Sequence, residues 1–300
     1  MSARLSYRVG GASSFSENRP MSATPKTTCI PYVAPERPIR SYDTWADDRR
    51  ALPNELIRTS LFAVSKRTEI EREIASVDGL VIRYKGVPLD QSHLDVFAAV
   101  THLARGLAAD ATIRTTRYEL LTTIGWKPNE AGAKGFAWIW KRLSDLTAGT
   151  ILVEDRRRKV ATGPLLASVA IDENTERITI ALNQNVRPLF DFSTHLNSRT
   201  RHSLTSPLDK WMHAFLSSHT ATYPMKVATY HRLSGSTARL KEFNRQLKAC
   251  LERLKGCGII DAWDIANGLV MTQRAPTRSQ IRHICKSKKP TSNEPELCPF

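Results

Sequence analysis

Four cations gather near the end of the chain, on a stretch with the pattern of a helix. They are Arg239, Lys241, Arg245 and Lys248. The last three are spaced i, i+4 and i+7, so a helix places them on one face. Arginine can donate two hydrogen bonds to guanine, and lysine can reach guanine or phosphate, so this face is predicted to contact DNA. Glu242 and Glu252 on the same helix keep an ordinary solvated face open as the alternative.

A second group of cations lies between two segments with the pattern of β-strands. The group is Arg156, Arg157, Arg158 and Lys159. Cations at the tip of a hairpin suit a wing that lies along the DNA backbone or enters the minor groove. A plain charged turn is the alternative.

A third set of candidate contacts lies on an earlier predicted helix, which is less basic. Its members are Lys134, Trp138, Lys141 and Arg142. The cations of this set could face DNA. Trp138 falls on the same side, where its indole could pack on a sugar or on a thymine methyl group. Packing in the protein core is an equal alternative for this tryptophan.

An internal repeat contains both of these helices. Residues 94–103 and 208–216 each have apolar residues at helical spacing, and a short helical segment follows each, at 118–121 and 230–233. Each half then has a long amphipathic helix. The predicted apolar faces are Phe136, Ile139, Trp140, Leu143 and Leu146 in the first half, and Leu240, Phe243, Leu247, Cys250, Leu251 and Leu254 in the second.

Capping residues and glycines predict the boundaries of these helices. Thr116 has capping-box spacing to Glu119, and Ser236 is the expected N-cap of the long helix in the second half. Glycine supplies the left-handed stop with which many helices end. The glycines expected to interrupt or end helices are Gly125, Gly149, Gly235 and Gly256.

A β-rich segment follows each long helix. In the second half it contains Asn267 and Gly268, the strongest short signal for a hairpin. The first half has an additional predicted hairpin. The predicted strands are 150–154, 164–171, 176–182, 258–263 and 269–273. Each half therefore has the order helix, helix, turn, helix, hairpin, which is the order of a winged helix.

The predicted fold class is α+β, with two tandem winged-helix domains, each a helix-turn-helix plus a β-hairpin wing, and disordered termini. The predicted parts are a mobile N-terminal arm over 1–50, a first winged-helix domain over 51–200, a second over 201–274, and a basic mobile tail over 275–300. Met21 is a candidate second translation start.

Charge and cysteine usage limit the class of protein. The chain has 300 residues and a formal net charge of +15, which favours a polyanion as partner. Five scattered cysteines without a C-x-x-C pair argue against a disulfide framework or a zinc finger. Residues 1–14 lack the apolar core of a signal peptide and no run is long enough to cross a bilayer, so we expect a cytoplasmic protein without membrane contact.

Motifs that carry catalysis are missing from the sequence. It has no phosphate-binding loop for ATP, no nucleophile elbow and no H-E-x-x-H zinc motif. It also lacks the His-apolar-His triplet with which a nicking enzyme would hold its metal. The sequence therefore predicts a DNA-binding protein that is not an enzyme and uses no cofactor or metal.

Nine short stretches follow one another in an order typical of a known family. They are Leu52-Pro-Asn54, Thr59-Ser-Leu-Phe62, Tyr84-Lys-Gly-Val-Pro-Leu89, Tyr118-Glu-Leu120, Gly125-Trp126, Ser206-Pro-Leu208, Ser217-Ser-His219, Tyr223-Pro-Met-Lys226 and Gly256-Cys-Gly258. Each is weak alone, but their common order is fairly specific. Through them, residues 52–273 resemble the TrfA-type plasmid replication initiators.

The resemblance implies a protein that binds direct repeats of double-stranded DNA, called iterons, at a plasmid origin. It also implies opening of an adjacent AT-rich segment, binding of single-stranded origin DNA, and recruitment of the host helicase and host initiator. Exchange between dimers and active monomers and control of copy number are further implications. The family contacts the host sliding clamp through a short motif, which here would use Leu61 and Phe62, with anchoring of the first domain as the alternative.

Three other functions remain open. A winged-helix transcriptional regulator is the nearest, because a fold does not determine a function. A nicking enzyme would cleave DNA with the help of a metal. An architectural protein would bind DNA with little sequence preference.

Overall fold

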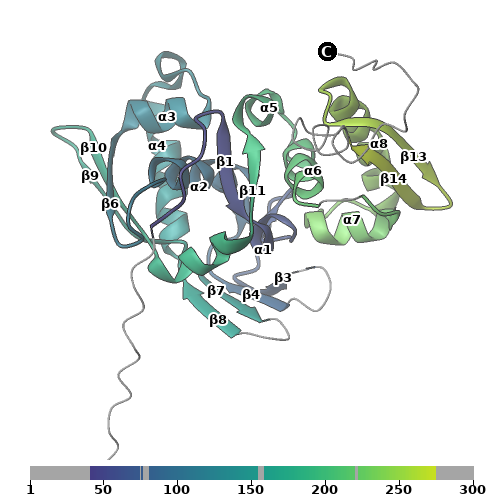
Figure 1. The fold of residues 1–300 in the computed structure, drawn as a ribbon, viewed down its shortest axis with the longest axis horizontal. Helices are drawn as coiled ribbons and strands as arrows, with labels where there is room; N and C mark the ends of the chain where they lie inside the picture. Colours follow the sequence, from purple (N-terminus) through teal and green to yellow (C-terminus); the bar gives the residue numbers. More distant parts are fainter. Residues whose placement is uncertain (1–40, 75, 77–80, 155–158, 220–221, 275–300) are drawn as a thin grey trace, which may run out of the picture. The chain divides into compact units, whose positions relative to one another are not determined.

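The structure is a computed structural model that describes residues 41–74, 76, 81–154, 159–219 and 222–274 (Figure 1). These residues form a mixed fold of helices and strands. The predicted tail over 275–300 and most of the predicted N-terminal arm, including Met21, lie outside the described residues.

In the first half, α2 contacts both α3 and α4. Apolar residues at helical spacing form the buried side of α2, and Asp90 caps its start with hydrogen bonds from the backbone of Ser92 and His93. The helices are α1 (Asn54–Ile57), α2 (Gln91–Leu103), α3 (Arg117–Ile124), α4 (Pro128–Thr147) and the 3-10 helix η1 (Gln184–Phe192).

Strands from distant parts of the sequence pair in small sheets of this half. Two short pairs are antiparallel β1–β11 and parallel β2–β5, and the larger sheets have the orders β6-β10-β9 and β3-β4-β7-β8. The strands are β1 (Arg49–Pro53), β2 (Phe62–Ala63), β3 (Glu71–Ile74), β4 (Val81–Lys85), β5 (Leu89–Asp90), β6 (Thr112–Thr116), β7 (Thr150–Glu154), β8 (Lys159–Gly163), β9 (Leu166–Asp172), β10 (Arg177–Leu182) and β11 (Ser193–Asn197).

The second half is smaller and has one sheet in the order β12-β14-β13. Its long helix α8 packs against α6 and α7 and is followed by the β13–β14 hairpin (Figure 1). The elements are α5 (Ser198–Ser203), α6 (Pro207–Ser217), β12 (Met225–Lys226), α7 (Val227–Ser234), α8 (Leu240–Gly256), β13 (Ile260–Ala266) and β14 (Leu269–Arg274).

Two hydrophobic cores form in the described residues. Phe97 of α2 belongs to the first core, and Trp211 of α6 belongs to the second. Along the chain, Leu196 belongs to the first core and Leu204 to the second. Ala214 of α6, although later in the sequence, packs in the first core. The helix α6 therefore contributes to both cores.

Local signals predicted many element boundaries correctly. The predicted helices are confirmed as α2, α3, α4, α6, α7 and α8, and the additional hairpin is confirmed as β9–β10. Thr116 caps α3 by accepting a hydrogen bond from the Glu119 backbone N–H over 3.1 Å. Asn267 and Gly268 both have positive φ, at 52° and 73°, as the tight turn of a two-residue hairpin requires.

Two boundary predictions are wrong, and a third is correct in position but not in backbone conformation. Ser236 does not cap α8, because Arg239 occupies the N-cap position and the Ser236 hydroxyl instead accepts from the Ala238 backbone N–H over 3.2 Å. α8 ends at Gly256 as predicted, but the left-handed residue that follows it is Gly258, with φ 67°. The backbone of Gly149 is not left-handed. A glycine is required there because the Tyr84 side chain lies so close that an added Cβ would be 2.5 Å from its hydroxyl oxygen.

The predicted apolar faces are wrong at two positions. Trp140 is 43% exposed, whereas Trp138 packs against the first core. Trp138 and Trp140 flank Ile139, the centre of the buried face, and point to opposite sides of it. Helical periodicity therefore does not distinguish them, and which one is covered depends on the groups packed beside it. Leu240 is exposed as well, because it lies at the very start of α8.

Residues 41–50 are not part of a mobile arm. Tyr42 is buried and contacts Phe190 edge-on, with ring centroids 5.3 Å apart. The Trp45 indole N–H donates to Nδ1 of His102 over 3.0 Å. Contacts with residues far along the chain therefore hold this segment in place. The sequence of the segment has no periodic pattern from which its packing could be predicted.

The packing of Gly149 predicts the effect of a single methyl group. Gly149→Ala should lower the free energy of unfolding by about 1–3 kcal/mol, because the methyl group must displace the buried Tyr84 ring. Gly256→Ala is the matched control, since no atom lies within 4 Å of its added Cβ, and it should leave stability unchanged or raise it by up to about 1 kcal/mol. Denaturant unfolding measures both, and equal effects of the two changes would contradict the steric explanation.

Candidate nucleic-acid interface

The exposed side of α8 carries the four cations that were predicted to contact DNA. Arg239 lies at the N-cap position, and Lys241, Arg245 and Lys248 are exposed on the helix. The opposite face, with Phe243 fully buried, belongs to the second core. The amphipathic pattern thus divides α8 into one buried apolar side and one basic side open to solvent.

Arg245 is paired with Glu242 on the same helix. Its Nη2 lies 2.7 Å from Oε1 of Glu242, and its Nε donates to Oε2 over 3.0 Å. The Arg245 side chain is 80% exposed, and exposed pairs of this kind contribute little to stability. The guanidinium can therefore exchange this carboxylate for another acceptor at small cost. Glu252, the other acid of this helix, accepts a hydrogen bond from the Trp263 indole over 3.0 Å.

A buried carboxylate fixes α8 against α6. Asp209, in the first turn of α6, is almost fully buried and accepts two hydrogen bonds from Arg253 of α8, over 2.6 and 2.8 Å. Paired hydrogen bonds of this kind fix both distance and orientation. Sequence reasoning missed this pair, because the two residues are far apart in the chain and each is unremarkable in its own helix.

The cations of α4 fall into two groups. Lys134 and Lys141 are exposed, although Lys141 lies 3.3 Å from Asp145 one turn later. Arg142 is half-buried and turned toward α2, where its Nε donates to the Ser92 hydroxyl over 2.7 Å. The structure therefore gives Arg142 internal partners and leaves the two lysines facing solvent.

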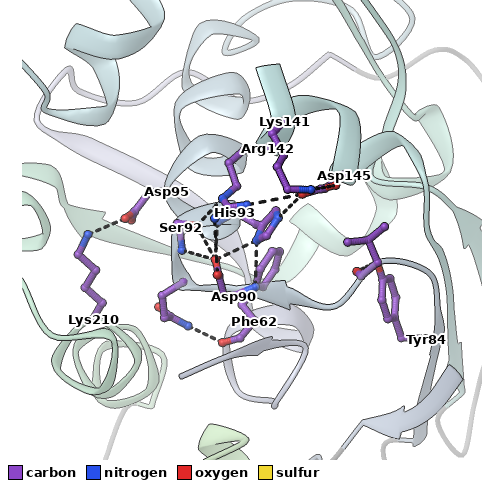
Figure 2. A network of polar contacts seen from close by, with 12 residues as sticks. Phe62, Tyr84, Asp90, Ser92, His93, Asp95, Lys141, Arg142, Asp145 and Lys210 are labelled. Atoms are coloured by element: carbon purple, nitrogen blue, oxygen red, sulfur yellow. Dashed lines mark hydrogen bonds and ion pairs between the residues drawn. The ribbon is translucent and has the colours of Figure 1, made fainter. Parts of the chain in front are cut away.

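Figure 2 shows the polar network that joins α4 to the start of α2. The imidazole of His93 lies between two carboxylates, with Nδ1 2.9 Å from Asp90 and Nε2 3.1 Å from Asp145. Arg142 completes the cluster at 3.6 Å from Asp145 and 3.9 Å from Asp90. Arg142 therefore gives both carboxylates a positive neighbour, and each nitrogen of the His93 ring lies within hydrogen-bonding distance of one of them.

The contacts in this network lower the pKa of Asp90. Burial alone raises the pKa of this carboxyl group, but hydrogen bonds from His93 and Ser92 and the charge of Arg142 lower it by more. The result is a pKa well below the ordinary value of an aspartate. The charged form of Asp90 is therefore the form that the fold stabilises.

Trp138 packs internally. Its ring stacks on Trp126 with centroids 4.6 Å apart, and the guanidinium of Arg142 lies over it at 5.6 Å. Trp126 follows Gly125, the left-handed residue with φ 91° that ends α3. The glycine stop thus places Trp126 where it covers Trp138, and the half-buried position is closer to the core alternative than to a free DNA contact.

The strands beside the predicted wing tip form as expected. β7 and β8 pair antiparallel, with Glu154 opposite Lys159. Arg156, Arg157 and Arg158 lie outside the described residues. Sequence analysis missed that β3 and β4 extend this hairpin into a four-stranded sheet.

The predicted sliding-clamp contact is wrong for this structure. Leu61 and Phe62 are 0% and 1% exposed, and the Phe62 ring stacks near Phe97 of α2. Neither side chain can reach a partner unless the first core opens. The alternative interpretation, anchoring of the first domain, fits their burial. Arg58 turns away from them and donates from its Nε to the Ser218 hydroxyl over 3.0 Å.

The described part of the chain contains no group of three or more His, Cys, Asp or Glu residues arranged to hold a metal ion. Within the same ranges, no helix is both long and apolar enough to span a bilayer.

Comparisons with known proteins point to one family. A family model described as TrfA protein matches residues 38–274. The "Plasmid replication initiator protein TrfA" of Escherichia coli is 29% identical over 236 residues, which cover 73% of this chain and 60% of that protein. The chain therefore spans less than two thirds of the length of this curated relative.

Two solved structures are similar at low sequence identity. The crystal structure of domains 2 and 3 of RctB covers 74% of this chain and 96% of that one, with a TM-score of 0.48 and 9% identity. The crystal structure of Pi initiator protein in complex with iteron DNA covers 77% of this chain and 99% of that one, with a TM-score of 0.49 and 8% identity. Neither score is high enough to assign the fold.

The lowered pKa of Asp90 predicts a pH-dependent loss of stability. Because the folded state favours the charged form, the contribution is complete above the unfolded pKa of about 4 and is lost as the pH falls below it. Asp90→Asn should lower the free energy of unfolding by about 1–2 kcal/mol at neutral pH, and the difference from the parent should vanish in strong acid.

Denaturant unfolding at a series of pH values measures this difference. Asp261→Asn, at an exposed position of β13, is the charge-matched control and should stay within about 0.5 kcal/mol of the parent. A deficit of Asp90→Asn that is the same at every pH would show that the charge of Asp90 is not the cause.

Proposed function

The chain belongs to the TrfA family, and from this membership we propose that it is a plasmid replication initiator that binds iterons at its plasmid origin. The observation that carries the proposal is the family match over residues 38–274. The basic face of α8 supports it, because four exposed cations on one helix suit the major groove.

The proposed fold of each half is a winged helix. In the first half α2, α3 and α4 are followed by the β7–β8 hairpin, and in the second α6, α7 and α8 are followed by β13–β14. We propose domains over 51–200 and 201–274, in which α4 and α8 are the recognition helices and α3 and α7 brace them. Two recognition helices in one chain would allow a monomer to recognise a long DNA site that has no two-fold symmetry.

The proposed DNA contacts differ in the two halves. On α8 they are Arg239, Lys241, Arg245 and Lys248, and on α4 the direct contacts are Lys134 and Lys141. Trp138 and Arg142 act mainly by holding α4 in place, because both have internal partners. The wing contributes Arg156 to Lys159 along the backbone or in the minor groove.

Family membership also supports the later steps of initiation. We propose that the bound protein promotes opening of the origin, holds single-stranded origin DNA, and recruits the host helicase and host initiator. Bending of the site and binding of the freed strand would supply the energy for opening. Monomers and dimers exchange, and the protein acts in the cytoplasm without a catalytic step of its own.

Selection from a random duplex pool tests the proposal. The purified full chain is incubated with the pool, and the bound fraction is sequenced. A nonpalindromic motif of about two helical turns, repeated in the origin of the plasmid, is the expected result. A short palindrome would instead favour a dimeric transcriptional regulator, and no enrichment at moderate salt would favour an architectural protein.

Arg245 should contribute sequence discrimination beyond its charge. Arg245→Ala is expected to weaken binding to the selected site by about 1–3 kcal/mol, because it removes a two-pronged hydrogen-bond donor. Arg245→Lys keeps the charge and should lose discrimination at one base pair while the salt dependence stays nearly unchanged.

Titration of labelled duplexes at several salt concentrations measures both effects. Arg177→Ala, on β10 of the first half and outside the set of proposed contacts, is the matched loss of one exposed arginine. If Arg177→Ala and Arg245→Ala reduce affinity equally for all sequences, Arg245 does not read a base.

A further inference from the structure

The two halves of the described chain meet through a buried arginine. We propose that the ion pair between Asp95 and Arg201 holds the two proposed recognition helices at one fixed separation, so that the protein accepts DNA sites with one spacing between their two parts. The proposal rests on the proposed function for its DNA consequence, and on contacts within the protein for the fixed separation itself.

Arg201 lies in α5, the short helix at the start of the second half, and is only 2% exposed. Its Nε donates to Oδ1 of Asp95 over 2.6 Å, and its two terminal nitrogens donate over 3.1 Å to Oε1 of Gln91 and to the backbone carbonyl of Lys210. The acceptors belong to α2 of the first half and to α6 of the second. One guanidinium therefore joins α2 of the first half to α6 of the second.

The partners of Arg201 are themselves held. Asp95, 9% exposed, also accepts from the Lys210 ammonium over 2.6 Å, and Figure 2 shows this lysine reaching across from its own helix. Gln91 donates to the backbone carbonyl of Phe62 over 2.6 Å. If α6 moved away from α2, Asp95 would lose the Lys210 ammonium and Arg201 would lose the Lys210 backbone carbonyl. If α5 moved with α6, the Asp95–Arg201 pair would break as well, and separating a buried ion pair is unfavourable.

Contacts on another side of the junction prevent rotation about this ion pair. The Trp211 indole of α6 donates to the backbone carbonyl of Thr59 over 3.2 Å, and the backbone N–H of Val64 donates to the carbonyl of Ser234 over 2.9 Å. Gly235 lies so close to Ala63 that an added Cβ would be 2.8 Å from the alanine methyl carbon. Together, these contacts restrict both translation and rotation of the second half relative to the first.

Each joined helix is fixed in turn to a proposed recognition helix. On α2, His93 pairs with Asp145 of α4, and Figure 2 shows this contact and Asp95 on the same helix. On α6, Asp209 holds Arg253 of α8 with two hydrogen bonds. Polar contacts with fixed geometry thus lead from α4 through α2, α5 and α6 to α8.

A fixed separation has a consequence that a flexible tether lacks. Inserting about five base pairs between the two parts of a site turns one part to the opposite side of the helix, and inserting about ten restores the side but moves it by about 35 Å. Two modules on a flexible tether recover affinity with the longer insertion, whereas two modules in one rigid body do not.

The test uses the motif selected by the full chain, with these two insertions placed between its parts. The parent protein should lose at least about 100-fold in affinity on both insertions, down to the affinity for one part alone. The double variant Asp95→Asn/Arg201→Gln neutralises both partners without changing the net charge. It should bind each part as the parent does, bind the uninterrupted site less tightly, and discriminate the longer insertion less than about 10-fold.

The matched control is Arg187→Gln/Asp191→Asn, which removes an ion pair of 3.0 Å within η1 of the first half. It should keep the strict spacing of the parent. Recovery of affinity by the parent protein on the ten-base-pair insertion overturns the proposal, whatever the variants do, so the test does not depend on their folding. Spacing as strict in a folded Asp95→Asn/Arg201→Gln protein as in the parent also overturns it.

A measurement without DNA separates this proposal from the proposed function. Spin labels are placed on α4 and α8 through Lys134→Cys and Lys248→Cys, with Cys29, Cys257, Cys285 and Cys298 replaced by serine. We expect one narrow distance distribution, broadened by Asp95→Asn/Arg201→Gln. A broad distribution in the protein with Asp95 and Arg201 intact overturns the fixed separation, while failure of the pool selection to yield any motif overturns the proposed function alone.

Discussion

The burial of Arg201 is the constraint around which the described chain is arranged. A guanidinium removed from water needs an acceptor for its N–H groups and an opposite charge nearby. Here those acceptors come from α2 and α6, and neither helix alone offers them all. The short helix α5 is therefore placed by both halves at once. Its next residue, His202, packs directly on Gly125 at the turn between α3 and α4, so the same helix also contacts the proposed helix-turn-helix.

The two halves use charge differently although their elements follow the same order. In the second half the cations of α8 remain on the solvent side, and Asp209 pairs with Arg253 at the helix end. In the first half Asp145 attracts both Lys141 and Arg142, and His93 and Asp90 extend that cluster to α2. On the proposed function, α8 is the better-equipped reader of bases, while α4 is held more firmly and has fewer cations free for DNA.

Family membership and geometry support different parts of the functional conclusion. The match to the TrfA family model concerns what the protein does, since an exposed basic helix alone suits an initiator, a regulator or an architectural protein equally well. The geometry concerns how it would do so, through two helices whose separation is fixed by buried polar contacts. The burial of Leu61 and Phe62 shows that two side chains expected from the resemblance to contact a partner instead pack inside the first core.

Sequence alone determined the features that arise from neighbouring residues. Apolar spacing defined α2, α6 and α8, the Thr116 hydroxyl capped α3, and Asn267 with Gly268 formed the tight turn, because each depends on backbone chemistry within a few residues. Only the tertiary structure decided the rest. Trp138 is covered because it stacks on Trp126, whereas Trp140 has no such neighbour among the described residues and is exposed. Arg142 faces the protein interior because it donates to Ser92, and Tyr42 packs in the first core. These outcomes depend on partners far along the chain, and local periodicity has no information about which distant groups meet.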